Sequence, residues 1–299
     1  ANQSDPSGVT PIEAAVISNN VCMIRALVER SANVNTTASD DSGDTVVHVA
    51  VENGFVDVLR ALAELGADVN VPNSDGATPV FAAAELGDIT IIEALGELGG
   101  NVRARKFGGQ SPLHCAARNG HLQTMKVLCS LGADVNSTSD SGATALFEAA
   151  EMGQVDVIIA LLKLGADINL GTENDGTPLH VASQEGHIDA IRQLVLMGAS
   201  VNGRDHVDEV TAISAAAEND QVEAMRVLVE LGADVNCCDA DNVSLVHIAA
   251  AEGSVDMMRG LGELGANVNA ADNYGVTAVW KAAVRGFVSI LGVLVELRA

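Results

Sequence analysis

Aromatic side chains are nearly absent from this sequence. Its 299 residues include one Trp, one Tyr and five Phe, although 48% of all residues are hydrophobic. A core of this composition must pack Ala, Val, Leu and Ile at close range, which favours helices stacked tightly side by side. No run reaches the roughly 18 apolar residues that a membrane-spanning helix requires.

Basic residues are also scarce, at 16 Lys and Arg against 40 Asp and Glu, for a net charge of −24. Such a charge disfavours binding to nucleic acid or to an anionic membrane. No signal peptide is visible at the N-terminus, so we expect an intracellular and cytoplasmic protein. The cysteines fit reduced thiols, because they are odd in number and share no metal-ligand spacing: Cys22, Cys115, Cys129, Cys237 and Cys238.

Catalytic motifs are missing as well. The sequence has no GxSxG, no phosphate-binding GxxxxGK[ST], no HExxH and no CxxC. We therefore expect no enzymatic activity, no metal and no cofactor.

What the sequence has in abundance is repetition. The phrase Gly-Ala-Asp-Val-Asn, or a variant, recurs at spacings of 33 to 35 residues and ends at Asn35, Asn70, Arg103, Asn136, Asn169, Asn202, Asn236 and Asn269. A second phrase, Thr-Pro-Leu-His or a variant, occurs nine times with the same period. A fixed period of this size predicts a stacked array, in which each unit contacts only its neighbours.

One repeat predicts a turn followed by two helices. Thr144 suits the N-cap of a short Ala-rich helix, and Gly153 suits its left-handed end. An amphipathic second helix follows over 155–162, and Gly165 ends it. Four sister repeats place proline at the first helical position, where its missing N–H costs nothing: Pro11, Pro79, Pro112 and Pro178.

These phrases resemble the ankyrin-repeat family over nearly the whole chain, from about Pro6 to Ala299. The clearest copies read Ser111-Pro-Leu-His-Cys-Ala-Ala-Arg-Asn-Gly-His and Thr177-Pro-Leu-His-Val-Ala-Ser-Gln-Glu-Gly-His. The resemblance implies an all-α solenoid with finger loops and first helices on a concave face, and protein recognition as the activity. It divides the chain, 1–299, into one array of nine repeats, approximately 6–39, 40–73, 74–106, 107–139, 140–172, 173–205, 206–239, 240–272 and 273–299.

The expected function is that of a scaffold, an adaptor or a subunit of a larger assembly. One alternative is the recognition arm of a longer multidomain enzyme or channel, which the full reading frame would reveal. Another is an elastic spacer, which would contact partners at its ends rather than along the fingers.

A histidine occupies the motif position only in alternate repeats, at His48, His114, His180 and His247. The family resemblance implies a structural role, bridging backbone groups between repeats. A shared metal site is disfavoured, because carriers two repeats apart would lie on the order of 20 Å from each other.

Glutamate recurs two residues before the closing glycine position, where the family resemblance tolerates or favours lysine. These residues are Glu29, Glu64, Glu97, Glu230, Glu263 and Glu296. A carboxylate in the last turn of a helix opposes the helix dipole. The pattern is explained either by a solvated outer face or by a basic partner.

The segment 98–133 has no acidic residue, although it lies inside a strongly acidic chain. It carries Arg103, Arg105, Lys106, Arg118 and Lys126, and Arg103 replaces the finger asparagine of the other repeats. We predict that this region binds an acidic protein segment, because Phe107 beside the cations is a good contact anchor. The predicted contact residues are Arg103, Arg105, Lys106, Phe107, Arg118 and Asn119. The alternatives are neutral drift and an intramolecular counter-charge for the neighbouring acidic repeats.

Three irregularities complete the pattern. Longer fingers are predicted within Thr36–Asp41 and within Arg204–Val210, from insertions there. Repeat nine ends on an apolar second helix, 290–299, and it holds the chain's one Trp and one Tyr. We expect further repeats or another subunit to cover this end, unless Glu296 and Arg298 suffice as a cap.

Overall fold

The computed structural model describes residues 3–6, 8–39, 42–172, 176–205 and 210–299. It forms two compact units, Ala1–Ala145 and Leu146–Ala299, and each is described by itself. These residues contain 18 helices and no β-structure beyond isolated bridges, which confirms the all-α class. The division into nine repeats of one array stays a prediction. The two longer fingers include residues 40–41 and 206–209, which lie outside the described residues.

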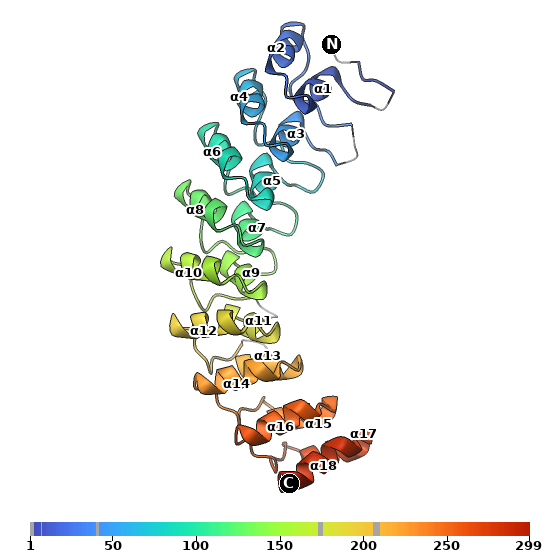
Figure 1. Ribbon diagram of the computed structural model, residues 1–299, viewed down its shortest axis with the longest axis vertical. Coiled ribbons are helices and arrows are strands. Elements are labelled where there is room, and N and C mark those ends of the chain that lie inside the picture. The colour runs from blue at the N-terminus through green and yellow to red at the C-terminus, as the bar shows by residue number, and fades with distance from the viewer. Residues whose placement is uncertain (1–2, 7, 40–41, 173–175, 206–209) are drawn as a thin grey trace. The chain divides into compact units, whose positions relative to one another are not determined.

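The N-terminal unit is built from consecutive helix pairs. First helices pack on first helices and second helices on second helices, as two neighbouring rows (Figure 1). The helices are α1 (Pro11–Ile17), α2 (Val21–Glu29), α3 (Val46–Glu52), α4 (Val56–Glu64), α5 (Pro79–Leu86), α6 (Ile89–Glu97), α7 (Pro112–Arg118) and α8 (Leu122–Ser130).

The C-terminal unit repeats this arrangement, and α9 begins on the last residue of the N-terminal unit. Its helices are α9 (Ala145–Glu151), α10 (Val155–Lys163), α11 (Pro178–Gln184), α12 (Ile188–Leu196), α13 (Ala212–Glu218), α14 (Val222–Glu230), α15 (Leu245–Glu252), α16 (Val255–Glu263), α17 (Ala278–Arg285) and α18 (Val288–Glu296). In both units the core is aliphatic, and small side chains such as Ala84 and Ala117 are fully buried where first helices meet.

Local sequence sets where the helices begin and end. Threonine or serine caps eight of the first helices in an extended conformation. Thr78 does so at α5, and Pro79 follows at the first helical position. Gly153 has a φ of 63°, which confirms its predicted left-handed conformation, and Gly165, predicted to end the second helix, has a φ of 93°. Both helices predicted in the repeat at 140–172 are confirmed by α9 and α10.

The motif histidines join neighbouring repeats, so the structural role implied by the family resemblance is confirmed. In His48, Nδ1 accepts a hydrogen bond from the Thr45 N–H (3.1 Å) and Nε2 donates to the Ala77 carbonyl (3.1 Å). His180 makes the equivalent contacts in the C-terminal unit. Burial lowers the pKa of both histidines, which favours the neutral ring that these hydrogen bonds require.

Glutamates near the ends of the second helices are paired with arginines of the preceding second helix. The pairs are Arg25–Glu64 (2.6 Å), Arg60–Glu97 (2.6 Å), Arg192–Glu230 (2.9 Å), Arg226–Glu263 (2.6 Å) and Arg259–Glu296 (3.1 Å). We call this series the arginine–glutamate ladder. Where repeats four to six lack the glutamate, the preceding repeats also lack the arginine. Five of the six glutamates therefore have a basic partner within the chain.

The ladder is expected to stabilise the units only modestly, because its side chains are largely exposed. In a double-mutant cycle on Arg226→Ala and Glu263→Ala, we expect a coupling of about 0.2–1 kcal/mol in the free energy of unfolding. The coupling should decline as salt screens the pair. Glu29→Ala is the matched control, because no ion pair of Glu29 is seen among the described residues. A coupling that is unchanged at high salt would contradict this account.

Candidate functional site

The finger between α6 and α7 carries most of the predicted contact residues. Its tip is a tight turn in which the Gly109 N–H donates to the Lys106 carbonyl (3.0 Å). Gly108 and Gly109 both have positive φ, and a Cβ on Gly109 would lie 2.6 Å from the backbone nitrogen of Asp140. Glycine is therefore required here, both for the turn and for the close approach of the next finger.

Arg103 keeps the structural role of the asparagine that it replaces. Its Nε donates to the Gly132 carbonyl (2.7 Å), as Nδ2 of Asn70 donates to the Gly99 carbonyl (3.1 Å). Asparagine also accepts a hydrogen bond from the next finger, as Asn70 does from the Asn101 N–H (2.7 Å). Arginine has no acceptor. The replacement thus exchanges an acceptor for a positive charge at the surface.

Arg105 is held in a similar way. Its Nε donates to the Gly109 carbonyl (2.8 Å) inside the same finger. Among the described residues, no hydrogen bond or ion pair of the terminal nitrogens of Arg103 or Arg105 is seen. Each guanidinium is therefore fixed by one nitrogen and presents its other two to the surface.

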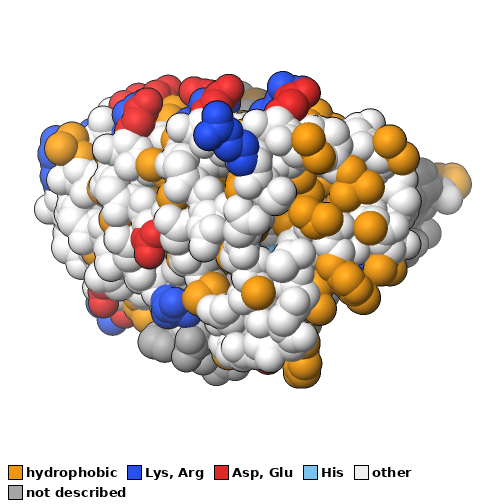
Figure 2. Space-filling view, turned by 90° about the horizontal axis from the view of Figure 1, so that it is seen from below, with side chains coloured by type: hydrophobic (Ala, Val, Ile, Leu, Met, Phe, Trp, Pro, Cys, Tyr) orange, Lys and Arg blue, Asp and Glu red, His pale blue; other side chains and the backbone are white. Residues whose placement is uncertain are grey.

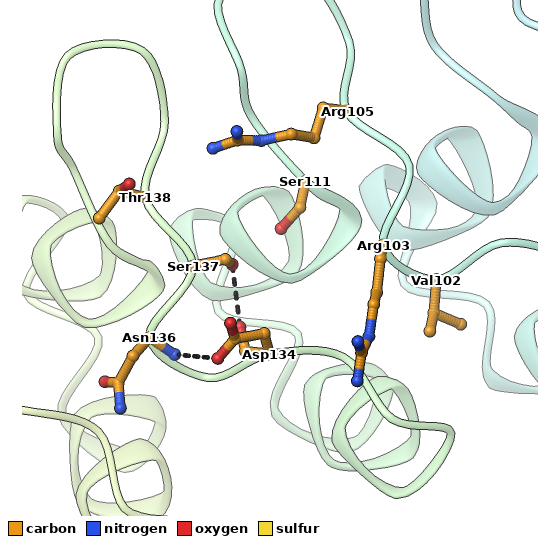
Figure 3. A pocket seen from close by; sticks show the side chains of 8 residues that line it. All are labelled: Val102, Arg103, Arg105, Ser111, Asp134, Asn136, Ser137 and Thr138. Carbon is orange, nitrogen blue, oxygen red and sulfur yellow. Dashed lines mark hydrogen bonds between the residues drawn. The ribbon is translucent and has the colours of Figure 1, made fainter.

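The two arginines flank a hollow of about 390 Å³ between successive fingers. Figure 3 shows Arg105 extending over the hollow from one finger, and Arg103 running along its edge. Asp134 lies below them, where its Oδ1 accepts from the Asn136 N–H (3.0 Å) and its carbonyl accepts from the Ser137 hydroxyl (2.9 Å). The full lining is Val102, Arg103, Arg105, Ser111, Asp134, Asn136, Ser137 and Thr138.

Lys106 and Phe107 do not line this hollow. The Lys106 ammonium lies 4.5 Å from the centre of the buried Phe81 ring, so it already makes a cation–π contact with the preceding repeat. Phe107 is 75% exposed at the fingertip, and its N–H donates to the Asp75 carbonyl (3.2 Å). Of these two residues, Phe107 is exposed and Lys106 is only partly exposed.

Arg118 and Asn119 lie at the C-terminal end of α7 and do not line the hollow. Asn119 is exposed, and its amide lies 3.5 Å from the Cys115 sulfur. Arg118 is also exposed but already takes part in an interaction within the chain. The six predicted residues thus form a finger cluster and a separate helix-end pair.

Six lining residues were missed by sequence reasoning: Ser111, Asp134, Asn136, Ser137, Thr138 and Val102. The first three are ordinary repeat residues, and sister repeats carry similar residues at the same positions. Only Arg103 and Arg105 distinguish this hollow in the sequence.

Comparison with known proteins identifies the architecture. A family model for ankyrin repeats, in three copies, matches residues 1–73, 65–139, 131–205, 165–239 and 213–299. The chain belongs to the ankyrin-repeat family. It is similar to the crystal structure of the human ASB11 ankyrin repeat domain, with a TM-score of 0.65 and 27% identity, over 75% of this chain and 99% of that one. No curated protein matches the sequence.

Ankyrin repeats bind other proteins, and they typically act as non-catalytic interaction domains. Because 631 solved chains match this ankyrin-repeat structure, the likeness identifies a fold and not a partner. No helix among the described residues is long and apolar enough to span a bilayer. The same part of the chain shows no group of three or more His, Cys, Asp or Glu placed to hold a metal ion.

Proposed function

We propose that this ankyrin-repeat protein is an adaptor or scaffold that binds an acidic segment of a partner at the finger hollow of repeat four. The observation that carries the proposal is the pair of guanidiniums that flank the hollow. Each is fixed through Nε to a backbone carbonyl, so little side-chain entropy remains to be lost when a carboxylate binds.

The surroundings favour a peptide rather than a free anion. Asp134 in the hollow would repel a second negative charge, but its carboxylate can accept a backbone N–H of an extended ligand. The exposed Phe107 lies on the same finger and offers an apolar contact for a neighbouring side chain. A ligand with one carboxylate at the arginines and an apolar residue nearby fits these groups.

The net charge of −24 makes this proposal specific. An acidic peptide is repelled by most of the surface, so binding requires a local site that overcomes the repulsion. Binding of an acidic peptide therefore cannot be explained by weak attraction to a generally basic surface.

The test uses fluorescent peptides rich in Asp, Glu and Phe, with Asn and Gln versions as neutral controls. We expect the acidic peptides to bind more tightly, and Arg103→Asn with Arg105→Gln to weaken binding about tenfold, equivalent to 1.4 kcal/mol. Arg103→Asn restores the residue of the sister repeats, so its structural hydrogen bond is kept.

Arg285→Gln is the matched control, because Arg285 is an exposed arginine on another repeat. Equal affinity for acidic and neutral peptides would refute the proposal, as would an affinity that the double variant leaves unchanged. Cross-linking in cells, with wild type and the double variant compared, would then identify the natural partner.

A further inference from the structure

The repeat asparagine joins neighbouring fingers through an acceptor as well as a donor. Its Oδ1 accepts a hydrogen bond from a backbone N–H of the next finger, while its Nδ2 donates to a glycine carbonyl, as Asn202 does to Gly232 (3.0 Å). The acceptor pairs include Asn35 with the Asp68 N–H (2.9 Å), Asn70 with the Asn101 N–H (2.7 Å), Asn202 with the Asp234 N–H (2.9 Å) and Asn236 with the Asn267 N–H (2.7 Å).

Repeat four lacks this acceptor. Asp134 stands in the same register to Arg103 as Asn101 does to Asn70, but arginine offers no lone pair to its N–H. No hydrogen bond of the Asp134 N–H is seen among the described residues. Asp134 is exposed and lines the hollow below the two arginines (Figure 3). The hollow therefore presents a backbone donor that sister fingers use internally.

An unused N–H alone does not mark a ligand site. The N–H of Ser200, at the same position of a later finger, also has no partner in the part of the chain that the structure describes. The residues that correspond there to Arg103 and Arg105 are Asn169 and Gly171, and neither is basic. In repeat four the same donor accompanies two guanidiniums, and this combination is what an anionic oxygen recognises.

The two guanidiniums are not neutralised by the hollow itself. No ion pair of Arg103 or Arg105 is seen among the described residues, although Asp134 lines the same hollow. In the arginine–glutamate ladder, by contrast, each arginine contacts a carboxylate. Figure 2, seen from the end that holds α17 and α18, shows basic and acidic side chains side by side along one edge. Both charges of the hollow therefore remain available to a ligand.

We propose that a side-chain carboxylate of the ligand completes the link that Arg103 interrupts, by accepting a hydrogen bond from the Asp134 N–H. This inference rests on the proposed function, because it concerns the same acidic segment. One carboxylate oxygen takes the place of the asparagine Oδ1, and the other faces the Arg103 guanidinium. A carboxylate suits both tasks, since its two oxygens accept hydrogen bonds separately and charge strengthens each bond.

The finger at Asp68 shows that the carboxylate of Asp134 does not obstruct this arrangement. The Asp68 N–H donates to Asn35 while its Oδ1 accepts from the Asn70 N–H (2.9 Å). Asp134 makes the second of these bonds in the same way, with the Asn136 N–H (3.0 Å). Its N–H is thus left for a ligand, which then joins the finger before α7 to the finger before α9. Ligand binding and attachment of the second finger are therefore coupled.

The test follows the amide signal of Asp134 by NMR in protein labelled with isotopic aspartate. The probe is the same acidic peptide rich in Asp, Glu and Phe, capped at both ends so that side chains supply its carboxylates. Without peptide, the Asp134 N–H should exchange with solvent faster than the Asp68 N–H. With saturating peptide, its proton signal should move downfield and its exchange should slow about tenfold or more. Asp68 and Asp234 are internal controls, because their N–H groups are already bonded.

Two substitutions of Arg103 separate the N–H from the charge. Arg103→Asn and Arg103→Ala both remove the guanidinium, but only asparagine supplies an internal acceptor to the Asp134 N–H. Arg103→Asn should therefore weaken binding of the acidic peptide about threefold or more beyond Arg103→Ala. In Arg103→Asn without peptide, the Asp134 N–H should exchange as slowly as the Asp68 N–H.

The outcomes separate this inference from the proposed function. Equal affinities in the two Arg103 variants would overturn the inference, as would an Asp134 signal that bound peptide leaves unchanged, and both would leave the acidic-peptide site in place. Equal binding of acidic and neutral peptides to wild type would refute the proposed function, and this inference would fall with it.

Discussion

Phe81→Ala is expected to lower the free energy of unfolding of the N-terminal unit by about 3–5 kcal/mol. Phe81 in α5 is 2% exposed and is among the largest buried side chains of a core made mostly of aliphatic residues. Its removal leaves a cavity between α5 and the next finger and removes the ring that faces the Lys106 ammonium. Urea unfolding followed by circular dichroism measures the loss, and hydrogen exchange assigns it to α3–α7.

Phe107→Ala is the matched control, because it removes the same side chain from an exposed position on the neighbouring finger. Its effect on stability should stay within about 0.5 kcal/mol. Equal losses of unfolding free energy in the two variants would show that the buried Phe81 ring does not stabilise this part of the unit. A large loss in Phe107→Ala alone would contradict the placement of both rings.

The helices were predictable because local signals in each repeat agree with one another. Proline at the first helical position, a Thr or Ser cap and a left-handed glycine mark the same boundaries again and again. The period then places apolar residues of successive repeats against one another, so packing follows from alignment of the sequence with itself. Gly153 illustrates this, since its sequence context predicts a left-handed conformation and the structure has it.

The site was predictable only in part. Local charge identified Arg103 and Arg105, but it could not show that Lys106 turns inward to Phe81, because that direction depends on a side chain 25 residues earlier. Asp134 and Asn136 look like ordinary repeat residues, so nothing in their identity marks the hollow. The arginine–glutamate ladder is visible in the sequence as a spacing, because each paired Glu follows an Arg by 37 to 39 residues.

His247→Ala is expected to loosen repeat nine from the rest of the C-terminal unit. His247 is fully buried, its Nδ1 accepts from the Ser244 N–H (3.0 Å), and its Nε2 donates to the Val276 carbonyl (3.0 Å). Alanine leaves the Ser244 N–H without this acceptor, while the Val276 carbonyl keeps its hydrogen bond from the Asp272 N–H (2.9 Å). A buried polar group left unpaired costs about 1–3 kcal/mol. The free energy of opening of α17 and α18 should therefore fall by about 1–3 kcal/mol. Hydrogen exchange read by mass spectrometry measures this opening directly.

The effect should be confined to the end of the chain, because a repeat contacts only its neighbours. Exchange in α11–α14 should stay as in wild type, and general loosening of the unit would contradict this independence. His247→Gln should recover part of the protection. Repeat one already shows that a carboxylate side chain fills the same position, since Glu13 accepts from the Thr10 N–H (3.2 Å) and from the Ser39 N–H (3.1 Å). Glutamine offers the same kind of acceptor, together with an N–H that can donate to the Val276 carbonyl. Equal hydrogen exchange in the Ala and Gln variants would contradict this account. It would mean that the volume of the His247 side chain, and not its hydrogen bonds, holds the last repeat in place.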